Sequence, residues 1–171
     1  MGYETPHDAK VGETLSPGRR RQAGLIAVIL LLVGRCALAA GPPFRPDPDL
    51  TPGAVLPVTA AEVCRPGYAK SVRHVDGKTK ALVYHEYGIE HHRSGAYEID
   101  HLISLGLGGS NDIRNLWPES LDTQPWNGRA KDRLEDRLHK LVCKGTLSLD
   151  EAQAAIASNW IAAYQKYVEK R

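Results

Sequence analysis

The sequence has three cysteines and no Cys-x-x-Cys pair, which excludes a zinc site built from four cysteines. Its longest apolar run, at residues 23–34, is shorter than the roughly 20 residues that a membrane-spanning helix needs. No internal repeat is visible, and no aromatic residues alternate with basic ones as in a nucleic-acid stacking surface. A chain of 171 residues with these absences allows one domain with extensions.

The net charge of +2 comes from the amino-terminal segment. Five of the 22 Lys and Arg residues and three of the 20 Asp and Glu residues precede Gly41, so 17 residues of each sign follow. The remaining chain is therefore near neutral, and its composition alone does not indicate nucleic-acid binding. Any basic surface must come from local clustering.

The first 40 residues have the three parts of a secretory signal: a basic flank, a short apolar run and an Ala-x-Ala site. We predict that residues 1–40 are a signal peptide and that the protein is exported, either periplasmic or secreted. The alternative is an uncleaved membrane anchor. Residues 41–57 contain six prolines and read as a linker, and residues 58–171 form the domain. We expect the mature domain to be a monomer without membrane contact.

Cleavage of the signal would remove Cys36 and leave Cys64 and Cys143, one near each end of the domain. Two cysteines in an exported chain favour a disulfide that closes a long loop. Two buried free thiols are the alternative if the protein stays in the cytosol.

Local patterns predict four helices and two strands. Capping boxes at Thr59 and Ser148 begin the first and last helices, the last ending near residue 168, and apolar periodicity predicts helices over residues 78–87 and 126–143. Between these lie a strand, a Gly-rich bend and a second strand that Pro118 ends. The order predicts an α+β domain that is mainly helical and has a very small sheet.

The two residues with the clearest chemical potential are Asp100 and His101, adjacent in an apolar strand. Buried polar groups are costly without partners, so this pair points to a site. Phosphodiester hydrolysis needs an activated water and a cation that stabilises the phosphate charge. A neutral imidazole can take the proton of the water, and a neighbouring carboxylate can hold a hard divalent cation.

Three motifs carry a family resemblance: Asp100-His101, the glycine-rich run from Gly108 to Asp112, and the run from Asn115 to Pro118. In these motifs the chain resembles the HNH endonucleases of the ββα-metal superfamily, in particular their small exported bacterial members. The resemblance covers residues 98–138. It implies a small ββα-metal finger, a β-hairpin plus a helix, embedded in the mainly helical domain.

The resemblance also implies roles for individual residues. His101 matches the general base, Asp100 matches the acidic metal ligand, and Asn115 matches the asparagine that braces the finger loop. The last metal ligand of the family is usually a histidine near the start of the following helix, but this chain has no histidine between Asn115 and Lys131. Asn127 is the best substitute. Asp132 and Glu135 of the same helix are further candidate metal ligands.

The resemblance implies one divalent metal ion as the cofactor. Mg²⁺ is the first candidate, and Mn²⁺ and Zn²⁺ are the alternatives. Basic residues of the following helix would meet the phosphates, although a solvated helix face explains them equally well; they are Arg129, Lys131 and Arg133.

We therefore expect a metal-dependent endonuclease that hydrolyses phosphodiester bonds of DNA, or alternatively RNA, with little sequence preference. The alternative is a non-catalytic scaffold domain of the HNH type that binds a protein or nucleic-acid partner. The absent last histidine favours this alternative.

Overall fold

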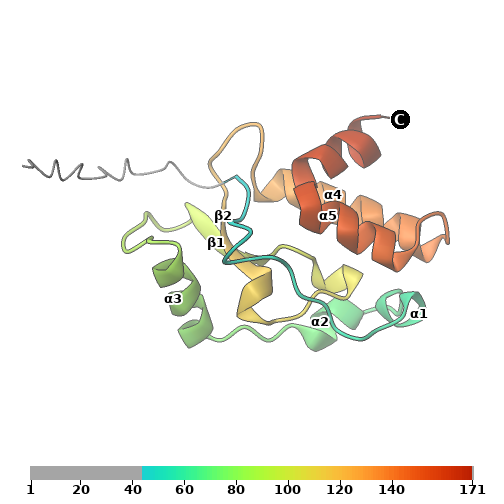
Figure 1. The fold of residues 1–171 in the computed structure, drawn as a ribbon, viewed down its shortest axis with the longest axis horizontal. Coiled ribbons are helices and arrows are strands. Elements are labelled where there is room, and N and C mark those ends of the chain that lie inside the picture. The colour runs from blue at the N-terminus through green and yellow to red at the C-terminus, as the bar shows by residue number, and fades with distance from the viewer. Residues whose placement is uncertain (1–43, 171) are drawn as a thin grey trace, which may run out of the picture. The chain divides into compact units, whose positions relative to one another are not determined.

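A computed structural model of the protein describes residues 44–170. The expected signal segment, residues 1–40, and the first part of the linker lie outside the described residues. Within residues 44–170, no helix has both the length and the apolar character required to cross a membrane. The described chain is of the α+β class, because helices accompany one two-stranded antiparallel sheet (Figure 1).

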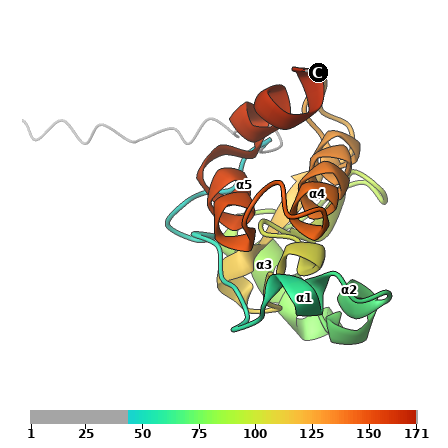
Figure 2. The ribbon, with the colours of Figure 1, turned by 90° about the vertical axis from the view of Figure 1, so that its right-hand side faces the viewer.

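Helices flank a central hairpin, with three short helices before it and two long ones after it. The elements in chain order are α1 (Ala60–Val63), α2 (Tyr68–Val72), α3 (Gly77–Glu86), β1 (Tyr97–His101), the 3-10 turns η1 (Leu105–Leu107) and η2 (Ile113–Asn115), β2 (Leu116–Ser120), α4 (Gly128–Cys143), α5 (Leu149–Tyr164) and the π-helical turn η3 (Gln165–Glu169). Helix α3 contacts β2, while α4 and α5 pack together on the other side of the hairpin (Figures 1 and 2).

The four helices predicted from the sequence are present. Thr59 and Ser148 form the capping boxes of α1 and α5. Helix α4 begins two residues later than predicted, because Asn127 caps it. The prediction that Pro118 ends the second strand is wrong, since Pro118 lies inside β2 opposite Ile99. In a two-stranded sheet each strand has an open edge, where a missing N–H removes no ladder hydrogen bond.

The core lies where the apolar faces of α4 and α5 pack against each other and against the hairpin. The predicted stripe of α4 is buried at Ala130, Leu134, Leu138 and Val142, and that of α5 at Ala152, Ile156, Trp160 and Ala163. One residue in α4 departs from this pattern. Lys131 is completely buried, although its neighbours in sequence gave no sign of it.

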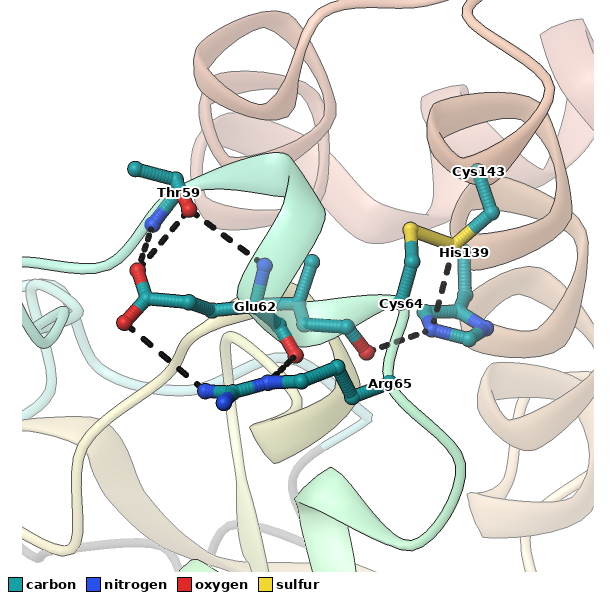
Figure 3. The surroundings of a disulfide bond; sticks show 7 residues. Thr59, Glu62, Cys64, Arg65, His139 and Cys143 are labelled. Carbon is teal, nitrogen blue, oxygen red and sulfur yellow. Dashed lines mark hydrogen bonds and ion pairs between the residues drawn. A yellow bond between two sulfur atoms is a disulfide. The ribbon is translucent and has the colours of Figure 1, made fainter.

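The predicted disulfide between Cys64 and Cys143 is confirmed. It joins the residue after α1 to the last residue of α4 across a sequence separation of 79 residues (Figure 3). A covalent link that closes so long a loop removes much of the conformational entropy of the unfolded chain. The bond therefore holds the start of the domain against its long helix.

We predict that replacing both cysteines with serine lowers the free energy of unfolding by about 2–5 kcal/mol. Urea unfolding followed by circular dichroism measures this change. Wild-type protein treated with a dithiol is the matched control, and it should lose the same amount. Equal unfolding midpoints for the oxidised and reduced proteins would contradict a stabilising role of the bond.

Candidate functional site

The hairpin gathers carboxylates on one of its faces. Successive side chains of a strand point to opposite faces, so Glu98 and Asp100 share a face of β1 and His101 lies on the other. Glu119 of β2 lies directly opposite Glu98 and therefore joins the same face. Two acidic side chains of β1 are thus brought together with one of β2.

Lys131 of α4 reaches into this acidic face. Its Nζ donates hydrogen bonds to Oδ2 of Asp100 at 2.6 Å, to the carbonyl oxygen of His101 at 2.7 Å and to Oε1 of Glu135. Oε2 of Glu119 lies 4.0 Å from the same nitrogen. An ammonium has three protons to donate, so Lys131 is fully engaged. We call Asp100, Glu119, Lys131 and Glu135 the lysine–carboxylate cluster.

The charges of the cluster follow from burial and from mutual attraction. Burial alone would lower the pKa of Lys131, but the carboxylates around it raise that pKa well above its usual value. Burial alone would raise the pKa of Asp100, but the charge and the hydrogen bond of Lys131 outweigh it, and the net shift is downward. Lys131 and Asp100 therefore form an ion pair at neutral pH.

Within the described chain, one oxygen of Glu119 lacks a hydrogen-bond partner. Its side chain is 2% exposed, and among the described residues its Oε1 is buried without a hydrogen bond. Burial raises the pKa of Glu119 to about 10, and the nearby charge of Asp100 adds to the increase. Burial also raises the pKa of Glu135 to about 7. Glu119 therefore carries a proton at neutral pH unless a further cation replaces it.

His101 is oriented by an asparagine that lies in the Gly-rich bend. Nε2 of His101 lies 3.1 Å from Oδ1 of Asn111. That oxygen also accepts the backbone N–H of His74 at 3.2 Å, and Nδ2 of Asn111 donates to the carbonyl oxygen of Val72 at 2.7 Å. Because Oδ1 is thereby fixed as an acceptor, Nε2 of His101 carries the proton and Nδ1 carries the lone pair.

The free nitrogen of His101 suits a base. The residue is 2% exposed, and burial lowers its pKa, so the imidazole is neutral at pH 7. Among the described residues, Nδ1 of His101 has no hydrogen-bond partner. Sequence reasoning assigned Asn111 only to the turn and missed its contact with His101.

Asn115 braces the loop between the strands. Its Oδ1 accepts the N–H groups of Ile103 at 2.9 Å and Ala54 at 3.4 Å, and its Nδ2 donates to the carbonyl oxygens of Ile103 at 3.0 Å and Ser110 at 2.9 Å. The amide has no hydrogen-bonding capacity left for chemistry. The close approach also requires Gly109, because a Cβ there would lie 1.7 Å from the carbonyl oxygen of Ile103.

Asn127 acts as the N-cap of α4. Its Oδ1 accepts the N–H of Ala130 at 3.1 Å, and its Nδ2 donates to the carbonyl oxygen of Thr123 at 2.9 Å. Among the described residues, no hydrogen bond or ion pair joins Asn127 to Asp100. The structure therefore places Asn127 in a capping role, with one lone pair of its oxygen left over.

The three basic residues expected to meet phosphates have different surroundings. Arg129 is exposed. Arg133 donates from Nε to the hydroxyl of Tyr164 at 3.1 Å and lies over that ring. Lys131 does not fit the expectation, because its side chain is 0% exposed and all three of its protons have partners. A direct contact between Lys131 and a phosphate is therefore excluded in this conformation.

The donor set can be compared with the divalent cation that the family resemblance implies. Hard cations such as Mg²⁺ bind carboxylate oxygens. The cluster offers the carboxylates of Asp100, Glu119 and Glu135. In the described part of the chain, Oε1 of Glu119 is buried without a hydrogen bond, although buried acceptors normally have one. Their chemistry suits a hard cation, but in this structure the Lys131 ammonium lies among their oxygens, so a cation would have to bind beside that ammonium or displace it. Glu119 and Glu135 share Lys131 with Asp100, whereas among the described residues no hydrogen bond joins Asn127 to this cluster.

A second group could hold a metal near the disulfide. Ligand atoms of Cys64, His139 and Cys143 lie within 4.8 Å of one another (Figure 3). Nε2 of His139 lies 3.5 Å from Sγ of Cys143 and 3.1 Å from the carbonyl oxygen of Val63. Because both sulfurs are bonded to each other, a metal could bind here only after reduction.

We predict that stability falls as pH rises and that Glu119 causes much of the fall. An unfolded glutamate titrates at about pH 4.3. Because the folded pKa of Glu119 is about 10, its proton stabilises the folded state fully below the unfolded value and progressively less as pH rises towards the folded one. Glu135, with a pKa of about 7, adds to the fall. The slope per proton is at most about 1.4 kcal/mol per pH unit.

Urea unfolding at several pH values between about 5 and 8, with EDTA present, measures this slope. Glu119→Gln should flatten it, because the amide does not titrate. The control is Glu90→Gln, which changes an exposed loop residue and should leave the slope unaltered. A Glu119→Gln slope equal to that of the wild type would contradict the prediction.

In comparisons with known proteins, no family model, no curated protein and no solved structure matches the chain.

Proposed function

We propose that the protein is a metal-dependent endonuclease that hydrolyses phosphodiester bonds of DNA, or alternatively RNA, on a ββα-metal finger formed by β1, β2 and α4. The observation that carries the proposal is the orientation of His101. Its Nε2–H is held by Asn111, its pKa is lowered by burial, and its Nδ1 lone pair is free to act as a base. The neighbouring Asp100 begins the cluster of oxygen donors.

Each residue of the site has a separate role in the proposed hydrolysis. Nδ1 of His101 takes a proton from a water molecule while the oxygen of that water bonds to phosphorus. The bond between phosphorus and the leaving oxygen breaks, and solvent supplies a proton to that oxygen. Asp100, Glu119 and Glu135 would hold one divalent cation, Mg²⁺ in first place. When bound, that cation supplies stabilisation of the charge on the phosphate. Lys131 positions Asp100 and keeps it ionised.

Export is part of the proposal. The Cys64–Cys143 bond supports it, because disulfides persist in oxidising compartments outside the cytosol. We propose that the mature domain acts as a monomer in the periplasm or outside the cell, with nucleic acid as its partner.

We predict that purified protein nicks supercoiled plasmid with Mg²⁺, Mn²⁺ or Zn²⁺ and that EDTA abolishes the activity. His101→Ala should lower the rate by about 10²–10⁴-fold, the usual contribution of a general base. Asn111→Ala should reduce the rate less and alter its pH profile, because the imidazole loses its fixed tautomer and orientation. His91→Ala is the matched control, since it removes an exposed histidine from the loop before β1.

Full activity of His101→Ala would overturn the proposed mechanism. Absence of activity with every metal, in folded protein that retains its disulfide, would favour a non-catalytic scaffold. One observation favours that second candidate: the oxygen of Asn127, at the place of the family's last ligand, already caps α4.

A further inference from the structure

A groove of about 440 Å³ runs between the α1–α2 segment and α4. One wall carries Arg65, Lys70 and Arg73, and the other carries Glu135, Asp136 and His139 of α4. Glu135 belongs to the lysine–carboxylate cluster, so the groove reaches the candidate site. We infer that the first wall binds the phosphate backbone of one nucleic-acid strand and leads it to that site. This inference rests on the proposed function and adds the path of its substrate.

The first wall is a local concentration of positive charge in a chain that is otherwise near neutral. Residues 65–75 contain Arg65, Lys70 and Arg73 and no Asp or Glu. All three side chains belong to exposed residues. Arg65 lies 3.8 Å from Glu62, whereas none of the ion pairs between described residues includes Lys70 or Arg73. Lys70 and Arg73 are therefore the charges available to an anionic partner.

Arg73 is linked to the general base through the backbone. It follows Val72, whose carbonyl oxygen anchors the Asn111 amide that orients His101. Burial is the main reason for the lowered pKa of His101, and the charge of Arg73 contributes to it. Arg73 is thus adjacent in the chain to the residue that anchors the asparagine beside the imidazole. An arginine suits the first wall because its guanidinium binds phosphate through two parallel hydrogen bonds.

The two walls have opposite charge, which fixes the side on which the strand lies. Asp136, which is exposed, would repel phosphates, so the backbone follows the α1–α2 wall. The volume of the groove lies in the range of pockets that hold a small molecule. A groove of this volume accommodates part of one strand.

The test compares two double variants of equal charge change. Lys70→Ala/Arg73→Ala removes the two free charges of the groove, and Lys78→Ala/Lys80→Ala removes two exposed lysines of α3. Fluorescence anisotropy measures the binding of a labelled single-stranded oligonucleotide, with EDTA present to prevent cleavage, between about 50 and 200 mM salt. The groove variant should bind about tenfold more weakly or worse, and the slope of log K against log salt should fall by about 0.7 per lost contact. The control variant should bind like the wild type.

Each other outcome overturns the inference. If the groove variant bound with the affinity of the wild type, the groove would not be the binding surface. If both variants lost the same affinity, net charge alone would set the affinity. If a duplex of the same sequence bound more tightly than the single strand, and the groove variant lost that binding, the ligand of the groove would be a duplex and not a single strand. Failure of the proposed function is seen separately, as plasmid nicking that survives His101→Ala.

Discussion

The contact between the Lys131 ammonium and the carboxylates around it holds the site together. A buried charge is destabilising unless it is paired and fully hydrogen-bonded, and Lys131 meets this condition with groups from β1 and α4. The same nitrogen lies near Glu119 of β2. The position of α4 relative to the hairpin therefore depends on one side chain as well as on the apolar core.

This constraint also sets the electrostatics of the site. Lys131 keeps Asp100 ionised, while burial, together with the nearby charge of Asp100, keeps the proton on Glu119 when no other cation is present. The neutral imidazole lies on the other face of β1, where Asn111 holds it through a separate set of hydrogen bonds. The side chains of Asp100 and His101 thus have separate hydrogen-bond partners, although the two residues are adjacent in the chain.

The features predictable from sequence are those with local signals. Capping boxes and apolar spacing predicted the helices, two remaining cysteines predicted the disulfide, and turn-forming residues predicted the bend that Asn115 braces. The burial of Lys131 had no local signal, since a lysine in an amphipathic helix is usually solvated. Glu119 could have been found only from the strand register, which places it opposite Glu98. The role of Asn111 depends on Val72, 39 residues away.

The Cys64–Cys143 bond joins the two walls of the groove, because Cys64 follows α1 and Cys143 ends α4. Separation of the walls at this end would require a covalent bond to break. During synthesis in a reducing compartment, only noncovalent packing would set the width of the groove. If the chain is exported as proposed, oxidation would then fix that width. The bond would thereby couple the maturation of the substrate path to the compartment in which the folded chain arrives.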